Sequence, residues 1–431
     1  MHRLPFLDDL AARGLIAQST PLAQLQSLLA EPQQQPVRLY CGFDPTAGSL
    51  HIGHLVPLLL LRRFQQAGHQ VIALIGGATG LIGDPSFKAS ERGLQSAAQV
   101  ASWAEQLQQQ IRQLLPQDGA GAVLILNNAD WLSQMTVPQL LRDVGKHFSV
   151  NALLQRESVR QRLQRPEQGL SFTEFSYVLL QAYDFAMLNR HYGCQLQIGG
   201  QDQWGNIVSG IDLTRRLNQQ QVYGLTLPLI TKADGTKFGK TETGTIWLDP
   251  ALTSPYRFYQ FWLAVSDQDV YSMLRWYSSM SIEAIAALER SDQQQQGKPQ
   301  AQQLLAAELT TLVHGQSGLA AAQRISQALF QTKTDQLSRS DLAQLQQDGM
   351  PAQQVDARLE LQQLLLQSGL VSSKQQLRQL LQAGALQLND RQIQSTQLTQ
   401  PLAAQPALQQ QYWLVRKGKK TALLWYSTAT G

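Results

Sequence analysis

Short apolar runs and amphipathic stretches alternate over the first half of the chain. Helical patterns occupy residues 51–68, which end at a glycine, and residues 96–115. The runs that predict buried strands are 37–43, 70–77, 121–131 and the first residues of 194–207. Short apolar strands that alternate with helices predict a parallel sheet with helices on its faces, a Rossmann-like α/β fold.

The pattern changes twice in the second half of the chain. The strand signal fades after Asp249, and residues 256–350 have a helical pattern almost throughout. Residues 372–393 then predict a capped helix, a glycine stop and a strand that turns at Asn389 and Asp390.

These changes predict three domains. Residues 1–250 form the Rossmann-like α/β domain, which begins with an amphipathic helix and a glutamine-rich connector in residues 1–35. Residues 251–350 form an α-helical domain, and residues 359–431 form a small α+β domain. A chain of 431 residues is long enough for this number of domains.

The composition is that of an ordinary globular protein, with 43% hydrophobic and 15% charged residues. The only two cysteines, Cys41 and Cys194, exclude a disulfide framework and favour a reducing compartment. Asp8 and Asp9 interrupt the N-terminal stretch, so it lacks the apolar core of a signal peptide. The apolar run at 55–61 is far too short to cross a membrane. We therefore expect a cytoplasmic protein without a membrane anchor.

The basic residues are unevenly distributed. The formal charge is +4, and the stretch from Arg416 to the end of the chain (RKGKKTALLWYSTATG) holds four basic residues and no acidic one. Such a stretch suits contact with nucleic acid phosphates, although a solvated tail has the same composition.

A histidine pair, His51 and His54, stands between the first predicted strand and the helix that follows it. A metal site would need a third ligand nearby, and histidines in the core of an amphipathic helix are another alternative. The position favours an anion site, because unpaired amides at the helix N-terminus and the positive end of the helix dipole would point toward the incoming ligand. Gly53 lets a ligand approach the backbone, and two imidazoles can donate to phosphate oxygens.

A polar, glycine-rich segment, KADGTKFGKTETGT (232–245), carries Lys232, Lys237 and Lys240. Alone it has the composition of a surface loop, and it lacks the Walker pattern of a P-loop. In combination with the histidine pair, its ammonium groups indicate a site for a polyphosphate.

One predicted helix carries three polar groups on a single face. Tyr177, Gln181 and Asp184 in SYVLLQAYDFAML are spaced i, i+4 and i+7 on an otherwise apolar helix. Burial of these groups is costly without a ligand or mutual partners. The spacing alone also fits an ordinary surface face.

The histidine motif HIGH and the later lysine-rich segment resemble the class I aminoacyl-tRNA synthetases. The motifs YCGFDPTAGSLHIGH, GGATGLIGDPS, GGQDQWGN and KFGKT are similar, in this order, to those of the bacterial tyrosyl-tRNA synthetases. KFGKT departs from the KMSKS consensus of the class but keeps both lysines. The resemblance covers essentially the whole chain. It implies that tyrosine reacts with ATP to give tyrosyl-adenylate and pyrophosphate, and then passes to the 3′ end of tRNA(Tyr).

The resemblance also implies roles for individual residues. Tyr177, Gln181 and Asp84 would hold the ammonium group of L-tyrosine. Tyr40 and Asp184 would bind its hydroxyl group, which phenylalanine lacks. The full set implied for L-tyrosine is Tyr40, Asp84, Tyr177, Gln181, Asp184 and Gln203. The set implied for ATP is Cys41, Gly42, Asp44, Gly53, Asp202 and Lys240. The set implied for catalysis is Thr46, His51, His54, Lys88, Arg92, Lys237, Lys240 and Thr241. The set implied for tRNA is Lys374, Arg378, Arg416, Lys417, Lys419 and Lys420.

The same resemblance implies ATP as a substrate with Mg²⁺, no protein-bound metal or organic cofactor, and a homodimer. The C-terminal segment resembles an RNA-binding domain shared with a ribosomal small-subunit protein. Three alternatives are a tryptophanyl enzyme, a nucleotidyltransferase with only the histidine motif, and a synthetase-derived RNA-binding protein. Tyr40 with Asp184 and the C-terminal domain disfavour the first. A nucleotidyltransferase of that kind would be much shorter and would lack the residues of the tyrosine pocket, and the intact motifs disfavour the third.

Overall fold

A computed structural model gives the structure of most of the chain. It describes residues 5–32, 34–86, 95–119, 121–164, 169–231, 240–241, 244–294, 300–418 and 421–427. Contacts divide the chain into two compact units. The first unit comprises Met1–Leu248 and Ser266–Ala301, and the second comprises Asp249–Val265 and Gln302–Gly431. The three predicted domains stay a prediction.

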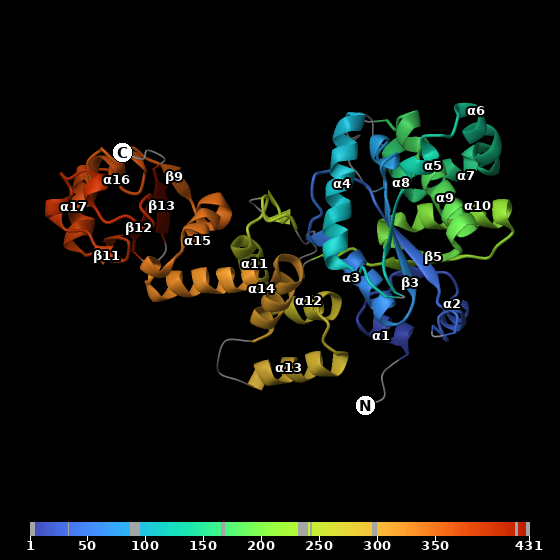
Figure 1. The fold of residues 1–431 in the computed structure, drawn as a ribbon, viewed down its shortest axis with the longest axis horizontal. Coiled ribbons are helices and arrows are strands. Elements are labelled where there is room, and N and C mark those ends of the chain that lie inside the picture. Colours follow the sequence, from blue (N-terminus) through green and yellow to red (C-terminus); the bar gives the residue numbers. More distant parts are fainter. Residues whose placement is uncertain are drawn as a thin grey trace. The chain divides into compact units, whose positions relative to one another are not determined.

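The first unit, which contains β3 and β5 in Figure 1, is built on a six-stranded sheet. Its strand order is β1-β6-β5-β2-β3-β4. Its strands are β1 (Gln18–Ser19), β2 (Arg38–Phe43), β3 (Gln70–Ile75), β4 (Leu124–Asn127), β5 (Cys194–Gly200) and β6 (Tyr223–Leu227). All neighbours are parallel except β1, which pairs antiparallel with β6. The predicted α/β fold is therefore confirmed. The chain order reverses between β2 and β5, and such a switch point is where open parallel sheets bind ligands.

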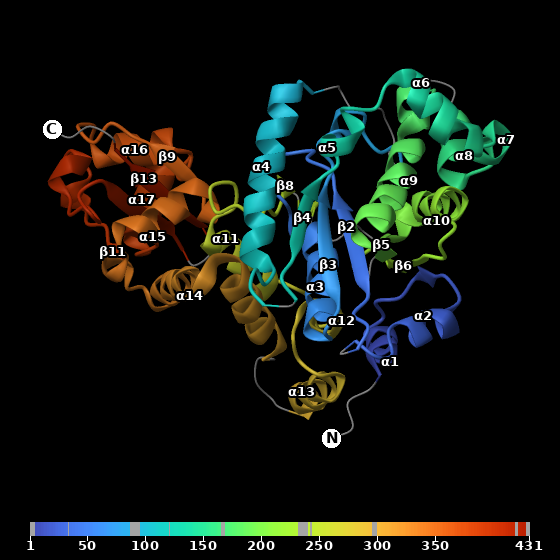
Figure 2. The same cartoon turned by 45° about the vertical axis from the view of Figure 1, so that its right-hand side comes forward.

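Helices cover both faces of this sheet, with α4 on one side and α9 and α10 on the other (Figure 2). The long helices are α3 (Ile52–Gln66), α4 (Ala97–Leu114), α9 (Phe172–Tyr192) and α10 (Trp204–Asn218). Alternate strand residues such as Tyr40, Ile72 and Leu74 pack with Phe185 and Leu188 of α9, as expected because successive strand side chains point to opposite faces.

The remaining elements of the first unit are short. They are α1 (Phe6–Ala12), α2 (Leu22–Leu28), η1 (Thr79–Leu81), α5 (Ala129–Leu132), α6 (Val137–Gln139), η2 (Leu140–Val144), η3 (Gly145–His147), α7 (Val150–Leu154), α8 (Glu157–Leu163), η4 (Gln201–Gln203), β7 (Lys240–Thr241), β8 (Gly244–Thr245), α12 (Val270–Tyr277) and α13 (Ile282–Gln294). The prediction of a single N-terminal helix in residues 1–35 is wrong. Gly14, with φ +71°, follows α1, and the chain then forms β1 before α2 begins after Pro21.

The second unit combines helices with a five-stranded sheet of order β11-β10-β12-β13-β9. Its helices are α11 (Pro255–Leu263), α14 (Ala301–Gln331, with a kink at Gly315), η5 (Thr334–Gln336), α15 (Arg339–Gln344), η6 (Leu345–Gly349), α16 (Leu361–Gln367), α17 (Lys374–Gln382), η7 (Ser395–Gln397) and η8 (Leu402–Ala404). Its strands are β9 (Ala352–Gln354), β10 (Leu386–Leu388), β11 (Arg391–Gln392), β12 (Tyr412–Lys417) and β13 (Thr421–Tyr426).

The local predictions for the C-terminal part are confirmed. The Ser373 side chain caps α17, and Gly384 follows the helix with φ +64°. Asn389 and Asp390 form the two-residue turn of the β10–β11 hairpin, with φ of +47° and +64°. Positive φ at both positions is the geometry of a type I′ turn, which asparagine and aspartate tolerate.

Among the helices that the structure describes, none combines the length and the apolar character needed to cross a membrane.

Candidate active site

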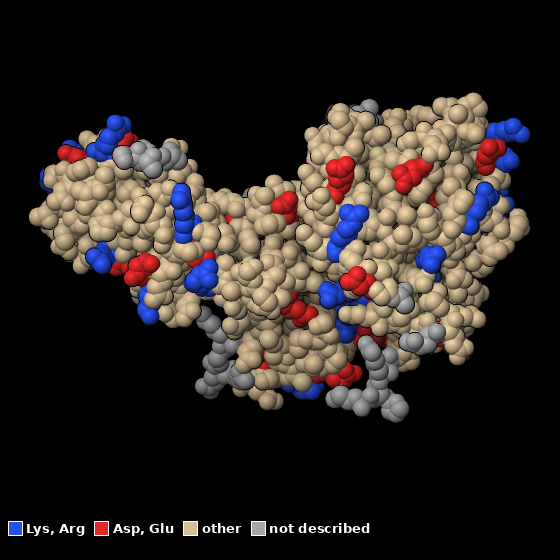
Figure 3. Space-filling model, viewed as in Figure 1, with Lys and Arg blue, Asp and Glu red and all other residues tan. Residues whose placement is uncertain are grey.

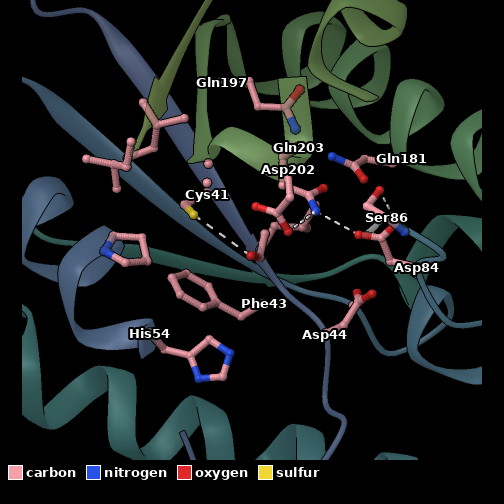
Figure 4. Close-up of a pocket in the computed structure, with 18 of the residues that line it drawn as sticks. Cys41, Phe43, Asp44, His54, Asp84, Ser86, Gln181, Gln197, Asp202 and Gln203 are labelled. Atoms are coloured by element: carbon pink, nitrogen blue, oxygen red, sulfur yellow. Dashed lines mark hydrogen bonds between the residues drawn. The ribbon is translucent and has the colours of Figure 1, made fainter. Parts of the chain in front are cut away.

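A cavity of about 410 Å³ opens at the carboxyl ends of the central strands of the first unit (Figure 4). It lies at the switch point of the sheet, where the topology places a ligand site. The sequence-predicted residues that line it are Tyr40, Cys41, Gly42, Asp44, Thr46, His51, Gly53, His54, Asp84, Tyr177, Gln181, Asp184, Asp202 and Gln203. The structure therefore brings fourteen of the predicted site residues to one cavity.

The other predicted residues are not among the described residues that line the cavity. Lys88, Arg92, Lys237, Lys419 and Lys420 fall outside the described residues. Lys240 and Thr241 form β7, but their side chains are outside the description. The remaining predicted residues, which lie in the second unit, are Lys374, Arg378, Arg416 and Lys417.

One end of the cavity holds a buried carboxylate with neutral donors. Asp184 is 2% exposed, and it accepts hydrogen bonds from the Trp131 indole (2.8 Å) and from the Asn128 amide (3.0 Å). Burial raises the pKa of Asp184 from 3.8 to about 7, although both hydrogen bonds favour ionisation. The group is thus an acceptor whose hydrogen-bond donors, in the described part of the chain, are both neutral.

Tyr40 lies beside this carboxylate and is 1% exposed, with its ring edge-on to Phe185 at a centroid distance of 5.3 Å. Burial raises the pKa of Tyr40 well above 10, and the charge of Asp184 adds to this shift. Within the described part of the chain, the Tyr40 hydroxyl has no hydrogen-bond partner. An unpaired buried hydroxyl costs free energy, so this end of the cavity matches a ligand that supplies a hydroxyl group.

A second region of the cavity gathers acceptors for a cation. The Tyr177 hydroxyl donates to Asp44 Oδ2 (2.8 Å). The hydroxyl oxygen of Tyr177 can therefore act as an acceptor toward a ligand. Asp84 accepts from Gln203 Nε2 and from the Ser86 hydroxyl, both at 2.7 Å (Figure 4). Gln181 Oε1 is buried and makes no hydrogen bond to any part of the chain that the structure describes. These acceptors suit an ammonium group.

The charge of the cavity supports the same conclusion. Four carboxylates line it, from Asp44, Asp84, Asp184 and Asp202, and no lysine or arginine stands among its described lining residues. A cationic group of a ligand would therefore meet several carboxylates, which attract it more strongly in a partly buried site than in water.

The histidine pair forms a capping box at the start of α3. The His51 amide donates to His54 Nδ1 (3.2 Å), and the Gly53 amide donates to His51 Nδ1 (3.0 Å). The amides of Ile52 and His54 donate to the carbonyls of Ile246 (3.1 Å) and His51 (2.8 Å). The prediction that unpaired amides face the ligand is therefore wrong for the amides of residues 51–54.

The capping bonds also determine the chemistry of the two rings. Each Nδ1 accepts a hydrogen bond, so a neutral ring carries its proton on Nε2 and can donate from that atom. The rings of His51 and His54 stack with centroids 3.9 Å apart. A Cβ atom at Gly53 would come within 2.8 Å of the His51 ring, so the glycine also makes room for the cap.

Strand β2 offers open backbone to the cavity. A Cβ atom at Gly42 would meet nothing within 4 Å, so a ligand can lie directly against this part of β2. The neighbouring Cys41 thiol points to the Gly42 carbonyl (3.8 Å), and burial raises the pKa of Cys41 to about 12. A neutral thiol at physiological pH can donate a weak hydrogen bond but is a poor nucleophile.

Sequence analysis missed four polar residues of the site, one of which is Ser86, the hydroxyl donor to Asp84. The other three, Thr79, Asn128 and Gln197, line the cavity and are nearly fully buried. Each of these three lies within a strand or just after one, and the rule that ligands bind at the carboxyl ends of parallel strands could have pointed to Thr79 and Asn128. Among the described residues there is no cluster of three or more His, Cys, Asp or Glu side chains that could hold a metal ion.

The predicted basic residues of the second unit fall into two groups. Arg416 donates to the Leu329 carbonyl (3.0 Å) and lies 3.4 Å from the Asp390 carboxylate, and Lys417 donates to the Leu370 carbonyl (2.8 Å). These bonds stabilise the unit itself. Lys374 and Arg378 are exposed on α17. On the face shown in Figure 3, basic side chains stand singly or in small groups among uncharged ones.

Comparisons with known proteins agree with this site. A family model described as tRNA synthetases class I (W and Y) matches residues 32–331. A second model, described as the tyrosine–tRNA ligase SYY-like C-terminal domain, matches residues 341–425.

Curated relatives match nearly the full length. Tyrosine–tRNA ligase 1 of Vibrio parahaemolyticus is 59% identical, over 96% of this chain and 97% of its own. The tyrosine–tRNA ligase of Aeromonas hydrophila is 61% identical over 96% of both. A C-terminally truncated mitochondrial tyrosyl-tRNA synthetase of Aspergillus nidulans superposes with a TM-score of 0.67 at 28% identity, over 76% of this chain and 95% of that one. The chain therefore belongs to the class I tRNA synthetases, within their tyrosyl branch.

Proposed function

We propose that this chain is a tyrosine–tRNA ligase. It activates L-tyrosine with ATP to form tyrosyl-adenylate and pyrophosphate, and it transfers the tyrosyl group to the 3′ end of tRNA(Tyr). The observation that carries the proposal is the pair of buried polar groups, Tyr40 and Asp184, at one end of a cavity that gathers ammonium acceptors at Tyr177 and Gln181.

This pair selects a phenol over a benzene ring. The hydroxyl of tyrosine can donate to Asp184 and accept from Tyr40, so both groups are satisfied. Phenylalanine leaves the Tyr40 hydroxyl without this partner and leaves Asp184 with one donor fewer, and each lost buried hydrogen bond costs about 1–3 kcal/mol. The protein therefore has no need of a separate hydrolytic site to remove phenylalanine.

Activation needs positioning more than a general base. The tyrosine carboxylate is already ionised, and it attacks the α-phosphate of ATP in line with the departing pyrophosphate. Hydrogen bonds from the Nε2 atoms of His51 and His54 stabilise negative charge on phosphate oxygens. The open backbone at Gly42, with Asp202, holds the ribose. Thr46, Lys88, Arg92, Lys237, Lys240 and Thr241 complete the phosphate contacts, and Mg²⁺ arrives with ATP.

The second unit binds tRNA. Its match to a tyrosine–tRNA ligase C-terminal domain and the exposed Lys374 and Arg378 support this role. Contacts of lysine and arginine with phosphates weaken steeply as the salt concentration rises, so tRNA binding is strongly salt-dependent. We place the protein in the cytoplasm, where its tRNA substrate is available.

The active form is a homodimer. Large apolar side chains are exposed in the segment from α6 to α9, where the helices cluster in Figure 1. They are Val137 (68% exposed), Leu141 (54%), Val150 (59%), Leu154 (39%), Leu163 (52%) and Phe172 (75%). Such a concentration is unusual on a monomer and typical of an interface. Light scattering should report a dimer, and Phe172→Asp with Val137→Glu should give monomers. A monomeric wild type would overturn this part of the proposal.

The proposal is tested by ATP–pyrophosphate exchange with purified protein, without tRNA, and with tyrosine, phenylalanine or tryptophan in turn. Exchange with tyrosine alone supports the ligase and its hydroxyl-selective pocket together. Exchange with tryptophan would show that the pocket has been misassigned. No exchange with any of the three would favour an RNA-binding protein without synthetase activity.

A further inference from the structure

A chain of hydrogen bonds joins the two ends of the amino acid pocket. Asn128 Nδ2 donates both to Asp184 Oδ2 (3.0 Å) and to the Thr79 hydroxyl (2.9 Å). The Thr79 hydroxyl donates to Asp44 Oδ1 (2.7 Å), whose other oxygen accepts from Tyr177 (2.8 Å). This series of hydrogen bonds thus runs from the hydroxyl end of the pocket at Asp184 to its ammonium end at Tyr177.

This series of hydrogen bonds connects residues that follow three neighbouring strands. Asp44 follows β2, Thr79 lies in η1 after β3, and Asn128 follows β4. These strands are adjacent in the sheet, so their carboxyl ends are spaced for contact between side chains. Gly76 makes the contact possible, because a Cβ atom there would come within 1.9 Å of Asp44 Oδ1 and 2.4 Å of Thr79 Oγ1.

The direction of each bond is determined by its neighbours. Asn128 Oδ1 accepts from the Ala78 amide (2.9 Å), so the NH₂ group faces Asp184 and Thr79. Asp44 accepts from Tyr177 and is an acceptor only, so the single proton of Thr79 goes to Asp44. Thr79 must then accept from Asn128. Thr79 and Asn128 are 2% and 1% exposed, which protects these bonds from water.

We propose that Thr79 is a positioning residue that couples the hydroxyl end of the tyrosine pocket to its ammonium end. The inference rests on the proposed tyrosine specificity. Through Asp44, Thr79 holds Tyr177 in the orientation that accepts from an ammonium group. Through Asn128, it holds Asp184 in the orientation that accepts from a phenol. Tyrosine uses both branches, whereas phenylalanine uses only the ammonium branch.

The coupling predicts an unequal loss when the hydroxyl is removed. Thr79→Val keeps the shape of the side chain but breaks both bonds. With about 1 kcal/mol for each bond, kcat/KM for tyrosine should fall about 30-fold and that for phenylalanine about fivefold. Discrimination between the two should therefore fall about fivefold. A hydroxyl with a purely structural role would lower both values equally and leave the ratio unchanged.

The experiment is ATP–pyrophosphate exchange with tyrosine and with phenylalanine, on wild type, Thr79→Val, Thr79→Ser and Thr214→Val. Thr79→Ser retains the hydroxyl and should restore the wild-type ratio. Thr214 is also fully buried, but its hydroxyl donates to the Gly210 carbonyl within its own helix, α10 (2.7 Å), so its valine variant is the matched control. If thermal unfolding shows that Thr79→Val does not fold, Thr79→Ala replaces it.

A lower ratio in Thr79→Val that Thr79→Ser restores supports the coupling. An unchanged ratio, or an equal drop in Thr214→Val, overturns it. If the wild type exchanges with tyrosine but the ratio of kcat/KM for tyrosine to that for phenylalanine does not depend on Thr79, only this inference is overturned. Wild type that fails to prefer tyrosine defeats the proposed function itself.

Discussion

Two buried carboxylates, one in each unit, are held in opposite ways. Asp184 in the first unit receives two neutral donors from the described residues, and burial raises its pKa to about 7. Asp341 in the second unit is fully buried as well, and it accepts two hydrogen bonds from Arg324 (2.7 and 2.8 Å). Burial opposes ionisation of Asp341 too, but the bonds from Arg324 and Ser338 outweigh it and lower the pKa.

This difference in hydrogen-bond donors distinguishes a carboxylate that binds a ligand, Asp184, from one that supports the fold, Asp341. Arg324 and Ser338 satisfy Asp341 within the chain, which stabilises α15 and leaves nothing for a ligand. Asp184 receives neutral donors from the described residues and a raised pKa, beside a hydroxyl of Tyr40 with no hydrogen-bond partner among the same residues. A buried polar group that remains incompletely satisfied costs stability, so its presence indicates a function in ligand binding.

The largest expected effect is that of Asp184→Ala. The loss of the acceptor leaves the phenol unpaired, and kcat/KM for tyrosine in ATP–pyrophosphate exchange should fall on the order of 10³-fold, or about 4 kcal/mol. Lys374→Ala is the control in the second unit. It should leave exchange unchanged and weaken only tRNA aminoacylation, with the larger deficit at high salt. Equal losses of exchange in the two variants would contradict the assignment of the two units.

The pH dependence of tyrosine binding should show the raised pKa of Asp184 directly. Below about pH 7 the carboxyl group is protonated, so without ATP the affinity for tyrosine should fall about tenfold per pH unit, and above it the affinity should level off. Equilibrium dialysis between pH 5 and 8.5 measures this. Asp184→Asn should give a flat, weak profile, and a sloping profile in that variant would assign the titration to another group.

The sign of the stability effect follows from the same shift. Because the folded pKa of Asp184 lies above its ordinary value of 3.8, its contribution to the stability of the empty protein is full below that value and is lost as the pH rises through about 7. Asp341 has a lowered pKa, so its contribution is present above the ordinary value and is lost as the pH falls through the folded value.

Tyr40→Phe should have a smaller effect, confined to binding. The substitution removes a hydroxyl that has no partner in the described part of the chain, so the melting temperature should stay the same or rise slightly. The KM for tyrosine should increase about tenfold, and that for phenylalanine should hardly change. A clear drop in melting temperature would indicate that the hydroxyl supports the fold instead.

Asp341→Asn should affect stability alone. It breaks the bonds with Arg324 and should destabilise the second unit by about 1–3 kcal/mol at neutral pH, with less effect in acid. Thermal unfolding measures the change, and tyrosine-dependent exchange should remain at the wild-type level. Asp356→Asn is the matched control, because its pair with Arg358 is exposed and such pairs contribute little. If the Asp341→Asn variant lost tyrosine-dependent ATP–pyrophosphate exchange, Asp341 could not be assigned a purely structural role in contrast to Asp184.

The sequence by itself determined the local features of this protein. Alternating apolar runs and helical spacing predicted the parallel strands, and the i, i+4, i+7 spacing predicted that Tyr177, Gln181 and Asp184 share a helix face. All three line the cavity. The turn at Asn389 and Asp390 was also predicted, because such turns depend on the conformational preferences of the two residues themselves.

Only the tertiary structure decided how distant residues are paired. Tyr177 bonds Asp44 across 133 positions, and Asn128 bonds Asp184 across 56. It also showed that Arg416 and Lys417 hold their own unit together and that His51 and His54 cap a helix. The physical reason is that periodicity and turn preference act over a few residues, whereas hydrogen-bond partners are set by which strand ends the fold makes adjacent.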